Sequence, residues 1–194
     1  MEDKLNENKS GGGMKRFPLA FVGSLALIAV GNVAGIFFRF VFSLFFARLF
    51  SELSANAPSA ARTAENISYL LCFAVCLAVI AVTVFRNGFL RNLYLSGADF
   101  EDYGFGSDAR DLLVHELPAQ LLASAVFALP IHAVMLIFGE INYLPTLFMP
   151  FFCLYKAVGN VWLSYPLSVA ACTLVIFVST LFAHRYFQKN RLHK

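Results

Sequence analysis

Four charge-free apolar stretches constrain this chain more than any other feature of its sequence. Each is long enough to cross a bilayer, since a helix of about 20 residues rising about 1.5 Å per residue covers about 30 Å of hydrocarbon. A helix also satisfies its own backbone polar groups in lipid, so we expect helices for all four. The sequence therefore predicts an all-α, polytopic integral membrane protein built on a four-helix transmembrane bundle, with spans at 17–38, 67–85, 117–138 and 161–183.

The composition indicates that little of the chain is exposed to water. Of its 194 residues, 59% are hydrophobic and 14% are charged, whereas charged residues make up about 25% of a typical soluble domain. We therefore expect one transmembrane domain over 17–185, in contact with the lipid bilayer, and no separate soluble domain. The basic side chains lie near the ends of the spans, which is typical of topology signals, so no nucleic-acid partner is expected.

The distribution of Lys and Arg predicts the topology. When the loops are assigned alternately to two sides, one side carries eleven basic residues and the other carries four. Because basic residues accumulate in cytoplasmic loops, the side with eleven is cytoplasmic. We predict a multi-pass protein of the cell membrane with both termini in the cytoplasm. The smaller group is Arg39, Arg48, Arg62 and Lys156, and the larger is Lys4, Lys9, Lys15, Arg16, Arg86, Arg91, Arg110, Arg185, Lys189, Arg191 and Lys194.

Both ends of the chain are predicted to be cytoplasmic tails. Residues 1–16 contain a Ser-Gly-Gly-Gly run and are expected to be disordered, and residues 186–194 form a short basic tail. The natural start is either Met1 or Met14. The apolar run that follows is longer than the about 7–15 residues of a secretory h-region, so we interpret it as an uncleaved signal anchor.

Two apolar segments do not fit a plain four-helix picture. Residues 40–50 either continue span one as a long tilted helix or form a short helix in the outer interface. Residues 143–155 contain Pro145 and Pro150 and are too short to cross the bilayer. They form either an interfacial segment or a re-entrant one that lines a substrate path.

Glycines mark one face of span one. Gly23, Gly31 and Gly35 belong to a row with four-residue spacing that Leu27 interrupts, and Gly31 to Gly35 is a G-x-x-x-G motif. Such small residues let membrane helices approach closely, so we predict a helix-packing face inside the bundle. The competing interpretation is that these glycines face lipid without a partner.

Arg39 lies on the same row, at the outer boundary of span one. A charge in the membrane must reach a partner or water, because its burial costs on the order of 3 kcal/mol. We predict an ion pair with Glu140, at the outer end of span three, with Glu65 as the alternative partner. The simpler interpretation is that Arg39 extends to the interface alone.

Polar side chains follow one face of each of the last two spans. They are Gln120, Ser124 and His132 in span three, and Ser164 and Ser168 in span four, all at helical spacing. We expect these rows to face one another inside the bundle, as hydrogen-bonded structure or as a polar pathway. Pro130 removes a backbone donor near His132 and is expected to kink span three.

The loop 86–116 is the one sizeable polar region, and it provides a possible surface for a membrane-protein partner. It carries six acidic residues, and apolar residues at helical spacing predict that span two continues beyond Phe85. No catalytic motif and no cofactor motif is present. The four cysteines have no zinc spacing and are expected to behave as small apolar residues, so neither a metal site nor a disulfide is predicted. They are Cys72, Cys76, Cys153 and Cys172.

These observations favour a non-enzymatic integral membrane protein that acts as a subunit or accessory factor of a larger membrane assembly. The alternative is a small-solute permease, or the membrane substrate-binding component of a transporter, that uses the polar rows of spans three and four. The sequence gives neither the partner, the substrate nor the oligomeric state.

Overall fold

The computed structural model describes residues 2–94, 114, 116–139 and 148–191. These residues form five helices and no strand: α1 (Glu2–Asn56), α2 (Pro58–Tyr94), α4 (Leu117–Phe138), α5 (Met149–Val158) and α6 (Val161–Arg191). The predicted all-α class is therefore confirmed for the described part of the chain.

Four of the described helices are long and apolar enough to span a membrane, which agrees with the predicted multi-pass membrane protein. The bounds of α4 coincide with those of predicted span three, because Pro118 lies in its first turn and Gly139, with φ at 71°, follows its last residue. The short helix α5 does not qualify. The membrane-compatible segments are Ala20–Asn56, Pro58–Arg86, Leu117–Phe138 and Val161–Ala183.

Helices α1 and α2 form a long antiparallel hairpin. Residues 40–50 continue α1 as far as Asn56, so the interpretation of a separate interfacial helix after Arg39 is wrong. Arginine is a good helix former, and no proline lies between Arg39 and Pro58 to interrupt the backbone hydrogen bonds. Ala57 alone separates the two helices, and Pro58 begins α2 at the first helical position, where its missing N–H costs nothing.

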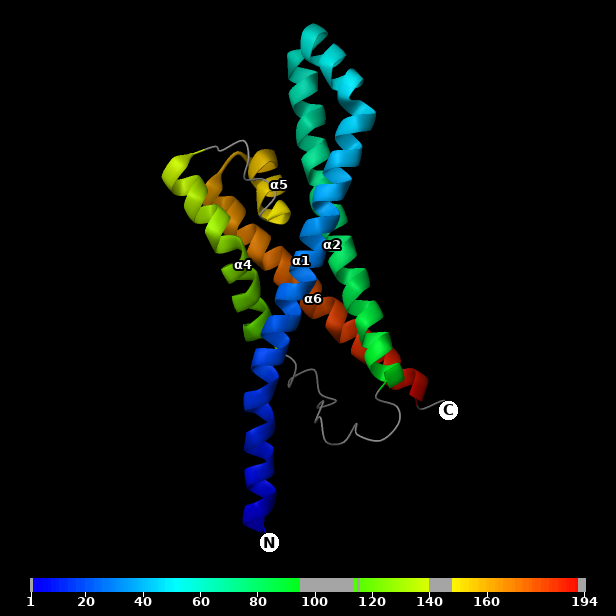
Figure 1. The fold of residues 1–194 in the computed structure, drawn as a ribbon, viewed down its shortest axis with the longest axis vertical. Helices are drawn as coiled ribbons and strands as arrows, with labels where there is room; N and C mark the ends of the chain where they lie inside the picture. The colour runs from blue at the N-terminus through cyan, green and yellow to red at the C-terminus, as the bar shows by residue number, and fades with distance from the viewer. Residues whose placement is uncertain (1, 95–113, 115, 140–147, 192–194) are drawn as a thin grey trace.

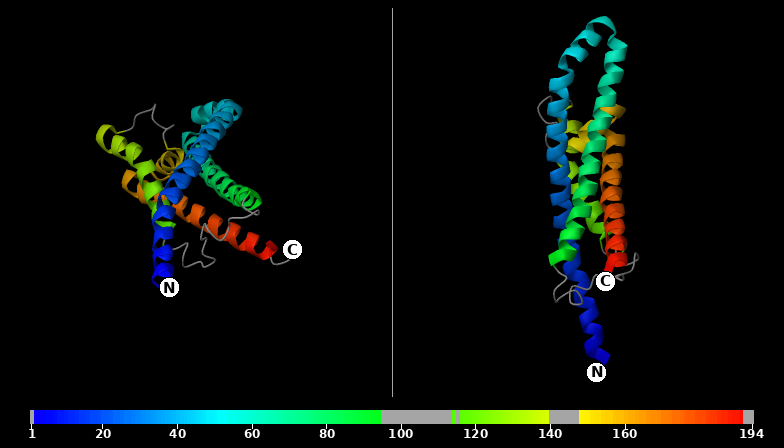
Figure 2. Two further views of the ribbon diagram at one scale, coloured as in Figure 1. Left: turned by 60° about the horizontal axis from the view of Figure 1, so that its bottom comes forward. Right: turned by 90° about the vertical axis from the view of Figure 1, so that its right-hand side faces the viewer.

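The hairpin rises well beyond the other helices. In two perpendicular views, the cyan ends of α1 and α2 extend past the nearest ends of α4, α5 and α6 (Figures 1 and 2). The start of α1 and the end of α6 lie at the opposite end of the molecule (Figure 1). Because the chain runs through four long helices, its first and last helices end on the same side of the molecule. This agrees with two termini on one side of a membrane.

The ends of the long helices extend further than the sequence predicted. Residues 1–16 were expected to be disordered, but α1 begins at Glu2, so the described backbone there is helical. Extending a helix that already exists adds one hydrogen bond per residue fixed, which favours propagation from the span. Helix α2 continues beyond Phe85 to Tyr94, as predicted, and α6 continues to Arg191.

Helix α5 is a short buried helix inside the bundle. It takes up 149–155 of the proline-containing segment, and residues 140–147 lie outside the described residues. Five of its ten residues are buried, and it packs against α1, α2 and α6. An interfacial helix would bury only one apolar stripe against the membrane surface, whereas α5 contacts three helices.

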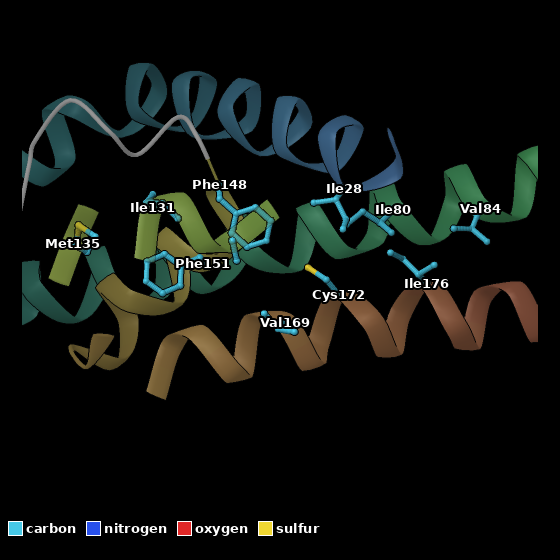
Figure 3. Close-up of a cluster of buried hydrophobic side chains, with 11 residues drawn as sticks. Ile28, Ile80, Val84, Ile131, Met135, Phe148, Phe151, Val169, Cys172 and Ile176 are labelled. Carbon is cyan, nitrogen blue, oxygen red and sulfur yellow. The ribbon is translucent and has the colours of Figure 1, made fainter. Parts of the chain in front are cut away.

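The main core lies where all five helices meet. Figure 3 shows that Ile28 of α1 and Ile80 of α2 lie side by side, with Phe148 and Phe151 between α4 and α6. Because lipid tails are as apolar as these side chains, close van der Waals packing stabilises this core more than exclusion of water does.

Candidate functional site

Gly31 and Gly35 lie where α1 approaches α2 and α5 most closely. A Cβ atom added to Gly31 would lie 2.5 Å from Ile80 Cγ1 and 3.2 Å from the Cys76 carbonyl oxygen. One added to Gly35 would collide with Cys76 Sγ and lie 3.1 Å from Met149 Cβ. Both positions therefore require glycine for the observed helix separation.

Gly23 differs from the other two glycines of the row. It is exposed, and no atom of the described residues lies within 4 Å of a Cβ added to it. Its part in the predicted packing face is therefore not seen, because the row drifts around the helix and turns away from α2 at this level.

A cluster of thiols fills the space that Gly35 leaves open. Cys72 Sγ donates to the Gly35 carbonyl oxygen at 3.3 Å, and the thiols of Cys76 and Cys153 lie beside it. All four cysteines are buried and free. Within the described ranges, no group of three or more His, Cys, Asp and Glu side chains is placed to hold a metal ion. Cys72, Cys76 and Cys153 pack in one buried cluster where α1, α2 and α5 meet.

Arg39 joins α1 to α2 through a hydroxyl and an aromatic ring. Its Nη1 donates to Ser68 Oγ at 2.8 Å, and its guanidinium carbon lies 4.2 Å from the centroid of the Tyr69 ring. The Ser68 hydroxyl in turn donates to the Glu65 carbonyl oxygen at 2.7 Å. Tyr69 extends the contact to α5, because its ring meets Phe152 edge-on at 5.9 Å.

Of the two carboxylates predicted as partners of Arg39, the structure describes only Glu65. Glu140 lies outside the described residues. The alternative partner, Glu65, contributes its backbone carbonyl to this network. Further along the hairpin, Arg48 forms an ion pair with Glu52 at 3.2 Å. Among the described residues, Arg39 thus contacts the Ser68 hydroxyl and the Tyr69 ring, and no carboxylate.

The polar rows of α4 and α6 are buried, and two hydrogen bonds join the helices. Thr173 Oγ1 donates to Ser124 Oγ at 3.2 Å, and the Tyr165 hydroxyl donates to the Ala125 carbonyl oxygen at 3.2 Å. The acceptor of the second bond, Ala125, lies five residues before Pro130, which was expected to kink this helix. Ser124 also donates to the Gln120 carbonyl oxygen at 2.9 Å.

His132 lies in a box of three aromatic rings. Tyr165 stacks on it at a centroid distance of 4.4 Å, and Phe151 and Trp162 meet it edge-on, each at 5.8 Å. The imidazole is buried, and its Nδ1 has no hydrogen-bond partner among the described residues; the same holds for Gln120 Oε1. His132 Nδ1 thus lies among aromatic rings without a described hydrogen-bond partner.

Ser164 and Ser168 are the last two residues of the predicted polar rows, and both hydroxyls donate to backbone carbonyls three or four residues earlier. Ser164 donates to the Asn160 carbonyl oxygen at 2.7 Å, and Ser168 donates to the Tyr165 carbonyl oxygen at 2.9 Å. Of the five residues proposed for a polar pathway, Ser124, Ser164 and Ser168 therefore spend their donors on local backbone groups. That leaves Gln120 and His132 with buried atoms that lack a partner among the described residues.

Sequence reasoning missed Asn32, which lies inside the G-x-x-x-G motif. Its Oδ1 accepts the backbone N–H of Met149 at 2.6 Å, across 117 residues of chain. The residue that precedes α5, Phe148, makes no side-chain cap, so α1 supplies the cap instead. The signal was a single amide in a span without charges, which must find a partner in the membrane.

The outer hairpin carries an exposed apolar surface that we name the hairpin face. It consists of large side chains of α1, of which Phe45 is 79% exposed. A neighbouring open groove of about 590 Å³ lies between the end of α1 and the start of α2, lined mainly by small residues such as Ala60 and Ala64. The hairpin face is Phe37, Phe40, Leu44, Phe45 and Leu49.

Comparison with known proteins assigns no function to any of these sites. No protein-family model matches the chain, and searches of curated proteins and of solved structures return no significant match.

Proposed function

We propose that this protein is a non-enzymatic subunit or accessory factor of a larger membrane assembly, and that the hairpin face is its attachment surface. The observation that carries the proposal is an apolar surface that continues along α1 beyond the other helices. Phe40, Leu44 and Phe45 are 60%, 63% and 79% exposed, and all three lie past Arg39.

The length of α1 argues that lipid covers only part of this surface. Its apolar segment Ala20–Asn56 has 37 residues, so it rises about 55 Å, against about 30 Å of hydrocarbon. A tilt of about 40°, the upper end of the usual range, still leaves a rise of about 42 Å. If α1 stands nearly upright, it leaves the hydrocarbon about 20 residues after Ala20, close to Phe40. Exposed apolar side chains beyond that point are typical of a surface that binds another protein.

The two helices of the hairpin differ in polarity at the same height. The first turns of α2 expose Ser59, Arg62 and Glu65, as expected of a helix in water. The facing part of α1 exposes Phe45 and Leu49 beside the charged pair Arg48 and Glu52. The exposed apolar side chains of this part of α1 are the proposed contact with a partner.

The alternative of a permease has weaker support. A transport path needs polar groups that are available to a solute. In the predicted pathway, the hydroxyls of Ser124, Ser164 and Ser168 donate to backbone carbonyls of their own helices. Gln120 Oε1 and His132 Nδ1 are the buried pathway atoms that lack a partner among the described residues.

The proposal keeps the localisation, the topology and the loop surface that were predicted from the sequence. We place the protein in the cell membrane with both termini cytoplasmic, from the distribution of Lys and Arg, so that the hairpin projects from the outer side. The acidic loop between α2 and α4 is a second proposed contact surface, and it lies outside the described residues. We propose that α5 is re-entrant, because its first residue meets Asn32, about 10 Å along α1 from Arg39.

Purification from native membranes tests the proposal. A tagged chain extracted in mild detergent should bring further polypeptide with it, and Leu44→Gln or Phe45→Gln should release that polypeptide. Ile137→Gln is the matched control, because Ile137 is also exposed but lies at the end of α4. Equal recovery from all three variants would contradict attachment through the hairpin face.

A further inference from the structure

Three of the four cysteines meet in one cluster, although they come from two distant segments of the chain. Cys72 and Cys76 lie one turn apart on α2, and Cys153 lies in α5. The Cys72 thiol is in hydrogen-bond contact with the thiols of the other two. It also donates to the Gly35 carbonyl oxygen at 3.3 Å, where the missing side chain of Gly35 leaves room for sulfur. We name Cys72, Cys76 and Cys153 the thiol cluster.

The geometry of the helices decides which of these thiols can be joined. A disulfide needs Cβ atoms about 3.8 Å apart and a sulfur–sulfur bond of about 2 Å. Residues four positions apart on a helix have Cβ atoms about 5–6 Å apart, so a bond between Cys72 and Cys76 would distort α2. Cys72 and Cys153 lie on different helices, and a small shift of α5 brings two thiols already in contact to bonding distance.

We propose that the thiol cluster is an oxidation site, at which Cys72 and Cys153 form a disulfide that joins α2 to α5. The oxidant is a hydroperoxide, the class of compound that unsaturated lipids form within a bilayer. One thiol takes the terminal peroxide oxygen and becomes a sulfenic acid, which releases an alcohol. The second thiol attacks that sulfur and displaces water. The two thiols thus lose two protons and two electrons, and the hydroperoxide becomes an alcohol and water.

The surroundings of the thiol cluster suit an apolar oxidant. All three side chains are fully buried, so charged or bulky reagents do not reach them. A hydroperoxide dissolved in the bilayer meets one layer of side chains before it reaches sulfur, and the same burial shields the finished disulfide from glutathione. That layer is apolar and only partly buried, and it consists of Ile36, Phe38, Phe73 and Phe152.

The disulfide fixes α5 at a second point. The first is the hydrogen bond from Met149 N to Asn32 Oδ1 at 2.6 Å. Cys153 lies one turn further along α5, so oxidation converts a helix held by packing and one cap into a helix held covalently. The inference is independent of the proposed attachment surface, because each of these contacts lies inside one chain.

Peptide mapping of the full chain in its membranes tests the disulfide. The membranes are treated with cumene hydroperoxide, free thiols are blocked with N-ethylmaleimide during denaturation, and the protein is digested without reduction. Trypsin places Cys72 and Cys76 in the peptide 63–86, Cys153 in 111–156 and Cys172 in 157–185. We expect a reducible pair of 63–86 with 111–156, about tenfold or more above any pair that contains 157–185, because a disulfide tolerates little separation.

Single substitutions assign the bond. Cys72→Ala should abolish the linked pair of peptides, and Cys76→Ala should keep it. Cys172→Ala is the matched control, because this thiol is equally buried but belongs to the main core, and the linked pair should be unchanged. A linked pair that persists in Cys72→Ala would assign the bond to Cys76 and overturn the proposal. So would complete reaction of all four thiols with maleimide after peroxide treatment, or a link found only between two chains on a non-reducing gel.

Thermal unfolding in detergent gives a second readout. The peroxide-treated protein should unfold about 5–10 °C above the reduced protein, because the cross-link closes a long loop. Cys72→Ala should show no such shift, and Cys153→Ala repeats both tests from α5 if the substitution in α2 alters the fold. An oxidised protein that contains the linked peptides but unfolds at the same temperature would show that the bond does not fix α5.

Discussion

Asn32 of α1 accepts the first backbone N–H of α5 through its side-chain oxygen, at 2.6 Å from Met149 N. A helix that begins among buried side chains has donors that water cannot reach, and each unsatisfied one is costly. The amide of Asn32 therefore fixes the start of α5 and its position against α1. The contact lies between Gly31 and Gly35, whose missing side chains let the three helices meet.

We predict that Asn32→Ala destabilises the protein by about 1–3 kcal/mol, because it leaves the buried Met149 N–H without an acceptor. Asn160→Ala is the matched control. Asn160 caps the start of α6 through Leu163 N at 3.2 Å, but it is exposed, so water replaces it and the loss should be smaller. Thermal unfolding in detergent measures both. A larger loss for Asn160→Ala would contradict the role given to Asn32.

Gly35→Ala should cost about 1–3 kcal/mol, since its Cβ collides with Cys76 Sγ in a packed contact. Gly23→Ala should be neutral or stabilising, because its Cβ would meet open space and alanine is the better helix former by about 1 kcal/mol. Adding Cys76→Ala should recover part of the loss from Gly35→Ala. Equal stability of Gly35→Ala and the unmodified chain would show that α1 and α2 are further apart than observed.

Arg39 and Ser68 should be coupled in a double-mutant cycle. Arg39→Leu alone and Ser68→Ala alone each remove one partner of a 2.8 Å hydrogen bond. The double variant should therefore lose about 0.5–1.5 kcal/mol less than the sum of the two. The same cycle with Glu140→Gln tests the ion pair predicted from the sequence. Additive losses in both cycles would leave Arg39 as an isolated residue at the interface.

His132→Phe should keep the stability of the protein or raise it, because phenylalanine preserves the ring contacts and removes the buried Nδ1 that lacks a partner among the described residues. His132→Ala should cost about 3–5 kcal/mol, since it leaves a cavity among three rings. Thermal unfolding of both variants gives the comparison. If His132→Phe is as damaging as His132→Ala, the polar atom is essential, and the permease alternative gains support.

The four spans were predictable because charge-free runs of about 20 residues leave the chain few alternatives to crossing a membrane. The end of span one was not. Arg39 suggested a boundary, because a charge is costly in lipid, but a charge does not break a helix, and α1 ends only before Pro58. Hydropathy thus indicates where lipid ends, whereas backbone hydrogen bonding decides where the helix ends.

The contacts within the bundle were only partly predictable. The four-residue spacing of Gly31 and Gly35 marked a face on which helices can approach closely. The partner of Asn32 lies 117 residues away in the chain, so no local pattern could reveal it. The aromatic box around His132 likewise joins α4, α5 and α6, and its rings come from segments that the sequence treats separately.

The central claim is that this chain works as part of a larger membrane assembly. Its most direct test is the mass of the protein particle, measured by native mass spectrometry after release from its own membranes without mutation. The account predicts a protein mass well above the 21.5 kDa of one chain. A particle that contains a single 21.5 kDa chain and lipid alone would contradict it.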